Sequence, residues 1–85
     1  MGKGWHERAE YDPDADAIYV YLRDARPVKT VAIDDLRNID YDGEGRVVGV
    51  ELLDVSGGID LHDVPFAHRV EQLISDLNLC IRIFA

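Results

Sequence analysis

Short runs of β-branched and aromatic residues, separated by turn signals, constrain the fold of this chain most. Residues 17–23, Ala-Ile-Tyr-Val-Tyr-Leu-Arg, have the composition of a strand and no helical periodicity. The sharpest turn signal is Gly43-Glu44-Gly45, because glycine adopts positive φ at little steric cost. We therefore predict a four-stranded antiparallel β-meander within residues 11–56. Its strands are residues 17–23, 28–33, 39–42 and 46–54.

The alternation of side chains predicts two different faces for this sheet. Ile18, Val20 and Leu22 share one face of their strand, and Tyr19 and Tyr21 share the other. In the last strand Val48, Val50 and Leu52 are expected on one face, opposite Val47, Gly49, Glu51 and Leu53. One face is therefore aliphatic, and the other carries tyrosines among polar residues.

An amphipathic helix is predicted over residues 63–78. Pro65 suits its first turn, and Asn78 can end it in a left-handed conformation. The apolar stripe consists of Phe66, Val70, Leu73, Ile74 and Leu77. We expect this helix to cover the aliphatic face, and the alternation in residues 79–85 predicts a short final strand. The fold class is α+β.

The length of 85 residues predicts one domain, with residues 1–10 as a flexible tail. The tyrosine-bearing face and the final strand are left without a partner within the chain. A second copy is the simplest partner for both, so we expect a homodimer.

The acidic charge is concentrated in the middle of the chain. The whole sequence has a formal net charge of −8, and residues 34–63 contain nine acidic and two basic residues. An acidic surface repels phosphate, so we expect no direct binding to nucleic acid. The same surface accelerates encounter with a basic protein.

No part of the sequence points to a membrane or to an oxidising compartment. No apolar run approaches the length of about 20 residues that a membrane span needs. The N-terminus has no apolar signal-peptide core, and one cysteine excludes an internal disulfide. We therefore expect a cytoplasmic protein.

Residues 40–51 contain a close match to a calcium loop. Acidic residues occupy positions 1, 3, 5 and 12 of the EF-hand pattern, and Gly45 occupies position 6. The flanking residues read as strands, however, whereas an EF-hand requires helices on both sides. A calcium-binding module remains an alternative interpretation, and the leading one includes no metal and no cofactor. The spacing of His62 and His68 is a weak metal signal.

No catalytic residue emerges from the sequence. Ser56 has no nearby base, and Cys80 reads as a small core residue in an apolar strand. Whether the chain is an enzyme stays open, with a small enzyme of unknown reaction as the second alternative.

The run Tyr11-Asp12-Pro13-Asp14-Ala15-Asp16-Ala17-Ile18-Tyr19 is the most distinctive in the chain. It resembles the opening of the proteins grouped as domain of unknown function 2283. The resemblance continues through Asp40-Tyr41-Asp42, the run 45–51 and Leu53-Asp54, and covers roughly residues 11–56. It implies a short β-meander domain. Members are often encoded beside small toxins of the ribonuclease type, which implies an antitoxin role.

These observations together favour a non-enzymatic protein-interaction module, antitoxin-like, that binds a basic partner such as a ribonuclease-type toxin. The acidic residues would make the electrostatic contact, and two tyrosines would supply apolar contact area. The predicted partner-binding residues are Asp34, Asp35, Asp40, Asp42, Glu44, Tyr19 and Tyr21.

Overall fold

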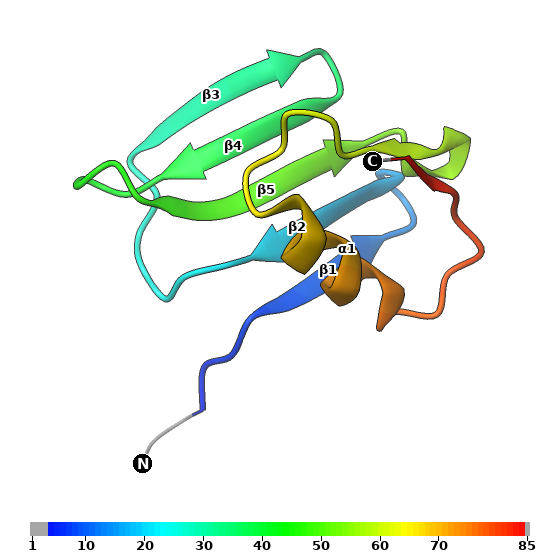
Figure 1. Ribbon diagram of the computed structural model, residues 1–85, viewed down its shortest axis with the longest axis horizontal. Helices are drawn as coiled ribbons and strands as arrows, with labels where there is room; N and C mark the ends of the chain where they lie inside the picture. The colour runs from blue at the N-terminus through cyan, green and yellow to red at the C-terminus, as the bar shows by residue number, and fades with distance from the viewer. Residues whose placement is uncertain (1–3, 85) are drawn as a thin grey trace.

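Strand β5 (Val47–Leu53) lies at the centre of a five-stranded antiparallel sheet in the computed structural model, which describes residues 4–84 (Figure 1). The strands follow the order β1-β2-β5-β4-β3 across the sheet. The other four are β1 (Arg8–Asp12), β2 (Ala17–Tyr21), β3 (Lys29–Asp34) and β4 (Arg37–Tyr41). The predicted α+β class is confirmed, but the predicted count of four strands is one too few.

The predicted meander is wrong in one connection, because β2 pairs with β5 and not with β3. Residues 22–28 therefore run past the ends of β5 and β4 to reach the far edge, which is a Greek-key arrangement. The register explains the pairing. Ile18 lies opposite Leu52 and Val20 opposite Val50, so the two most apolar strands are neighbours in the core.

The extra strand, β1, includes residues 8–10, which were expected in a flexible tail. Ala9 is buried and Tyr11 packs against the core, so every second residue of β1 faces inward. Arg8 and Glu10 point to the opposite face. Because these outward residues are charged, the segment lacks the apolar run by which the other strands were predicted. Residues 1–3 of the predicted tail lie outside the described residues.

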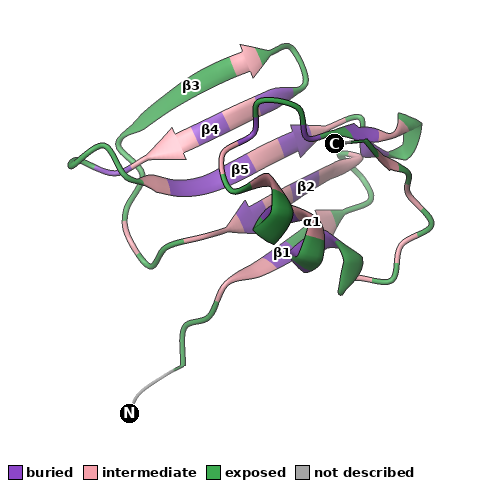
Figure 2. Cartoon of the chain, in the orientation of Figure 1, coloured by how far each residue is buried: buried purple, intermediate pink, exposed green. Residues whose placement is uncertain are grey.

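Helix α1 (Ala67–Ser75) packs on β1 and β2, as the sequence predicts for the aliphatic face (Figure 2). Val70, Leu73 and Ile74 of α1 are buried against Ile18 and Val20. Within the described residues, no helix is long and apolar enough to cross a membrane.

The helix is shorter than the predicted span of residues 63–78. Asp63 and Phe66 both have positive φ, at 66° and 57°, so the chain turns twice before α1 begins. Phe66 consequently leaves the buried stripe and is 64% exposed. Asn78 has the expected left-handed conformation, with φ 56°.

The segment after β5 covers the remainder of the core. It contains the short helix η1 (Val55–Gly57) and β6 (Ile59–Asp60), and Leu61 and Val64 that follow are buried. The predicted final strand over residues 79–85 is reduced to β7 (Ile83–Phe84), which pairs in parallel with β6. The C-terminal strand is thus paired within the chain and needs no second copy. Ala85 lies outside the described residues.

A buried arginine joins the sheet to this covering segment. Arg37 is 9% exposed, and its Nη2 lies 2.8 Å from the Asp34 carboxylate. Its Nη1 donates to the backbone carbonyls of Asp60, at 3.0 Å, and His62. Hydrogen bonds from Arg37 and from the Leu36 backbone N–H lower the pKa of Asp34.

Replacing the guanidinium should loosen this junction. We expect Arg37→Met to lower the free energy of unfolding by about 2–3 kcal/mol, because buried carbonyls lose a charged donor. The exposed Arg82→Met is the matched control and should change it by less than about 0.5 kcal/mol. Urea denaturation measures both, and equal losses in the two variants would contradict the assigned role.

Candidate functional site

The face of the sheet opposite α1 carries a connected layer of polar and aromatic side chains, which we call the tyrosine face. The one α-helix of the described residues packs on the other side. Strand alternation assigns to the tyrosine face Arg8, Glu10, Tyr19, Tyr21, Thr30, Asn38, Asp40, Gly49 and Glu51. Three carboxylates and one guanidinium give this set a negative charge.

The centre of the tyrosine face is a hydrogen-bonded cluster that spans four strands. Tyr19 of β2 donates from its hydroxyl to Asp40 Oδ2 at 2.7 Å, and Thr30 of β3 donates to Asp40 Oδ1 at 2.6 Å. The phenol ring crosses β5 at Gly49, where any Cβ would overlap the ring and its oxygen. Glycine is therefore required at this position by the close approach of Tyr19.

Tyr21 extends the cluster to the β1 edge. Its ring contacts that of Tyr19 in an edge-on arrangement, with centroids 4.7 Å apart. The Arg8 guanidinium lies 4.0 Å from the Tyr21 ring centroid and also contacts Glu10 at 2.9 Å. The tyrosine face thus already holds one guanidinium between an aromatic ring and a carboxylate.

Burial raises the pKa of the Tyr19 phenol well above its ordinary value, and the hydrogen bond to Asp40 and the negative charge of Asp40 add to the effect. Tyr19 therefore remains a protonated donor at neutral pH. Its function is to hold the Asp40 carboxylate in a fixed orientation.

A hollow of about 410 Å³ opens on the tyrosine face. Val48 contributes to it, because a β-bulge in the β4–β5 pairing interrupts the alternation between Val47 and Gly49. The sequence-based assignment of Val48 to the aliphatic face is therefore wrong, and Val47 instead packs against the core. The lining residues are Trp5, Arg8, Tyr19, Tyr21, Arg23, Asp24, Ala25, Pro27, Asp40 and Val48.

The predicted partner-binding residues divide into three groups. Asp40, Tyr19 and Tyr21 are brought together in this hollow. Asp34 ends β3 and Asp35 follows it in the β3–β4 turn, whereas Asp42 and Glu44 lie in the β4–β5 turn. These two turns are at opposite ends of β4, so the acidic residues do not form one continuous contact surface (Figure 1).

The Asp42 carboxylate binds to groups of its own turn. Asp42 is 7% exposed. Its Oδ1 accepts hydrogen bonds from the backbone N–H groups of Arg46, at 2.9 Å, and Glu44, at 2.8 Å. Its Oδ2 pairs with the Arg46 guanidinium at 2.9 Å. Hydrogen bonds from the Arg46 and Glu44 backbone lower the pKa of Asp42. The same arginine contacts Glu44 at 3.1 Å.

The calcium-like pattern of residues 40–51 folds as a β-hairpin and not as a loop around an ion. The three carboxylates point in different directions. Asp40 lies on the tyrosine face, and Asp42 points into its own turn. Glu51 accepts a hydrogen bond from the Asn38 side chain at 2.9 Å. Among residues 4–84, no three His, Cys, Asp or Glu side chains are grouped closely enough to hold a metal ion.

The remaining candidates lie elsewhere. Ser56 donates to Asp16 at 2.7 Å and fixes the β1–β2 turn to η1. Cys80 is exposed and not in the core, which corrects the sequence-based expectation.

Trp5, Arg8 and Asp24 line the hollow on the tyrosine face, although the sequence analysis did not predict them as site residues. Trp5 and Arg8 were assigned to a tail, and only the alternation of Ala9 and Tyr11 could have indicated a strand there.

The contact of Tyr19 with Gly49 can be tested by titration. The chain has four tyrosines, and we expect one to ionise well after the others, a late titration that Tyr19→Phe abolishes. In Gly49→Ala the displaced ring should titrate closer to the ordinary pKa of about 10. NMR of the tyrosine rings follows each group.

Gly43→Ala is the matched control, because a Cβ at Gly43 meets open space. It should leave the late titration in place. A late tyrosine that persists in Gly49→Ala would contradict the assigned geometry.

Comparison with known proteins identifies one family and one curated relative. The family described as "Protein of unknown function (DUF2283)" matches residues 8–56. Uncharacterized protein MJ0789 of Methanocaldococcus jannaschii is 37% identical over 59 residues, which cover 67% of this chain and 50% of that protein. The chain thus spans about half the length of this relative. No solved structure matches significantly.

Proposed function

The chain belongs to the DUF2283 family of proteins of unknown function, and we propose that it is a non-enzymatic interaction module whose tyrosine face binds a basic protein. One observation carries this proposal. The hollow on the tyrosine face places three aromatic side chains beside carboxylates, which is the chemistry that recognises arginine. The aromatic residues are Trp5, Tyr19 and Tyr21, and the carboxylates are Asp24 and Asp40. Arg8 and Arg23 line the same hollow, and Arg8 is already paired with Glu10.

The site is suited to a guanidinium for geometric reasons. A planar guanidinium stacks on an aromatic face and donates two parallel hydrogen bonds to a carboxylate. Arg8 lies over Tyr21 and donates one hydrogen bond to Glu10, which combines the same ring and carboxylate contacts within the chain. An arginine of the partner would bind in the same way between Tyr19 or Trp5 and the carboxylate of Asp24.

Asp40 is prepared for such a contact before the partner arrives. Tyr19 and Thr30 fix its two oxygens, and each oxygen retains capacity for a second hydrogen bond. A carboxylate that is already oriented loses little conformational freedom on binding, and this raises affinity.

The remaining acidic residues would act at a distance. Asp35 and Glu44 are exposed at opposite ends of the sheet and would steer a basic protein toward the chain through the overall field. The direct contact would be made by the tyrosine face. This division replaces the expectation that all five acidic residues contact the partner.

If the protein acts as an antitoxin, its basic partner would be a ribonuclease-type toxin. A surface that grips RNA is rich in arginine and lysine. An acidic protein bound there would compete with the RNA phosphates. The proposal places both proteins in the cytoplasm.

The state of Tyr19 favours binding over general-base or nucleophilic catalysis. A phenol with a raised pKa stays protonated, whereas a general base or a phenolate nucleophile needs a lowered one. Tyr19 therefore serves as a hydrogen-bond donor.

Charge reversal at matched positions tests the function. Tagged wild-type protein, Asp40→Lys and Asp35→Lys are used to capture partners from the native cell at low salt, and the captured protein is then purified and titrated. We expect a basic partner whose affinity falls at least tenfold in Asp40→Lys, about 1.4 kcal/mol. Asp35→Lys carries the same charge change outside the tyrosine face and should weaken binding less than threefold.

Equal weakening by the two variants would show that only the net charge matters. Capture of an acidic partner, or of no partner, would also contradict the proposed function. Circular dichroism of each variant establishes that the sheet is intact.

We also propose that two copies pair through the free edge of β3. This strand pairs only with β4, and Val28 and Val31 are 63% and 40% exposed. In antiparallel pairing centred between Val31 and Ala32, Lys29 would face Asp34 of the partner subunit.

The edge contact predicts a mass of two chains in sedimentation equilibrium at high protein concentration. Val31→Lys places a charge in the middle of the contact and should shift the mass to that of one chain. A wild-type protein that sediments as one chain at every concentration would contradict the dimer.

A further inference from the structure

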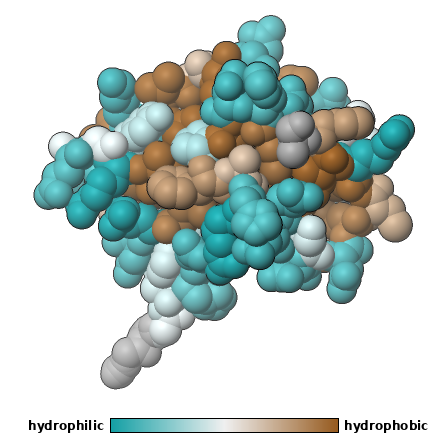
Figure 3. All heavy atoms as spheres, viewed as in Figure 1, coloured by the Kyte–Doolittle hydropathy of each residue, from teal (hydrophilic) through white to brown (hydrophobic). Residues whose placement is uncertain are grey.

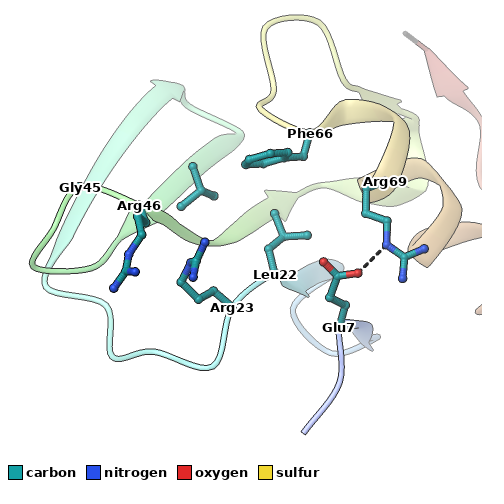
Figure 4. A pocket seen from close by; sticks show the side chains of 8 residues that line it. Glu7, Leu22, Arg23, Gly45, Arg46, Phe66 and Arg69 are labelled. Atoms are coloured by element: carbon teal, nitrogen blue, oxygen red, sulfur yellow. Dashed lines mark hydrogen bonds and ion pairs between the residues drawn. The ribbon is translucent and has the colours of Figure 1, made fainter.

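A second hollow lies on the helix side of the sheet, between the start of α1 and the β4–β5 turn (Figure 4). Its volume is about 380 Å³, within the range of about 300–1,000 Å³ of small-molecule sites. Three apolar side chains, three arginines, Gly45 and the carboxylate Glu7 line it, and Glu7 is paired with Arg69. The apolar side chains are Leu22, Val47 and Phe66, and the arginines are Arg23, Arg46 and Arg69.

Phe66 is held in an unusual conformation beside this hollow. Its φ of 57° lies in the left-handed region, which is rare for a bulky residue. The ring is 64% exposed, although it belongs to an apolar stripe that could have been buried. Apolar side chains are gathered on this side of the molecule (Figure 3), and the Phe66 ring projects over the hollow (Figure 4).

The arginines differ in how they are paired. Arg69 contacts Glu7 from the β1 side, and Arg46 contacts Asp42 and Glu44. Arg23 is exposed, and among residues 4–84 no carboxylate lies within 4 Å of its guanidinium. In a chain with nine Lys and Arg residues and a net charge of −8, three arginines surround one apolar hollow.

We propose that this hollow binds a small aromatic oxyanion, a compound that joins an aromatic ring to a phosphate or carboxylate group. The ring would pack on Phe66, Leu22 and Val47, and the oxyanion would bind to Arg23. An aromatic ligand can stack on Phe66, which an aliphatic ligand cannot do, and an oxyanion can form an ion pair with Arg23, which a neutral ligand cannot do. The structure thus points to a ligand that has both parts.

This site is separate from the proposed function. The tyrosine face is acidic and lies on the other side of the sheet, and Phe66 lines only the helix-side hollow. Arg23 lies at the edge that the two hollows share. Variants of Phe66 therefore separate the two sites.

Phenyl phosphate and benzoate are the probes, with inorganic phosphate and phenol as the two half-ligands. Each is titrated into ¹⁵N-labelled protein, and NMR shifts are followed at Gly45, Phe66, Arg69 and the Arg23 side chain. We expect at least one of the two probes to bind with a Kd of about 1 mM or below. Both half-ligands should bind at least tenfold more weakly.

Three variants locate the site. Arg23→Gln and Phe66→Leu should each weaken the bound probe at least fivefold, and Phe66→Leu should leave capture of the basic partner unchanged. Arg82→Gln removes the same charge from an exposed position elsewhere and should change the Kd less than twofold. The spectrum of each variant also shows whether it is folded.

The proposal is overturned if neither probe shifts these signals at about 10 mM. It is equally overturned if inorganic phosphate binds as tightly as phenyl phosphate, or if Arg82→Gln weakens binding as much as Arg23→Gln. Either result would mean a general attraction between cations and anions. If the site is present, the Kd values of phenyl phosphate and benzoate show whether it prefers a phosphate or a carboxylate group.

Discussion

The pairing of β5 with both β2 and β4 is the constraint on which the rest of the structure depends. Val50 and Leu52 point from β5 into the core beneath α1 and the segment that follows β5. Gly49 has no side chain, so Tyr19 can cross β5 and reach Asp40 of β4. One strand thus builds the core on one side and opens space for a polar cluster on the other. A larger residue at position 49 would disrupt the cluster while the core remained intact.

The two sides of the sheet consequently differ in chemistry, although Arg23 lies at the edge that their hollows share. The tyrosine face combines aromatic rings with carboxylates, whereas the helix side has an apolar hollow with arginines at its rim. The net charge of −8 conceals this difference. The charge of the acidic turns is partly compensated inside the chain, because Arg37 pairs with Asp34 and Arg46 with Asp42.

The sequence predicted the strand and helix types well, because period-2 and period-3.6 patterns depend only on near neighbours. It also predicted that Tyr19 and Tyr21 share a face. The partner of β2 was missed because pairing with β5 joins residues about 30 apart, and no local signal reports it. Strand β1 was missed since only Ala9 and Tyr11 face inward. The role of Asp42 in its own turn could have been inferred from Arg46, four residues later.

We propose that the tyrosine face, and not the acidic turns, holds the basic partner. Trp5 is the only tryptophan of the chain and lies at this face, so its indole N–H signal reports on the site directly. NMR of labelled protein titrated with the captured partner is the most direct measurement. We expect the largest changes at Trp5, Tyr21 and their neighbours on the face. Changes confined to the turns that carry Asp35 and Glu44, with Trp5 unaffected, would contradict the claim.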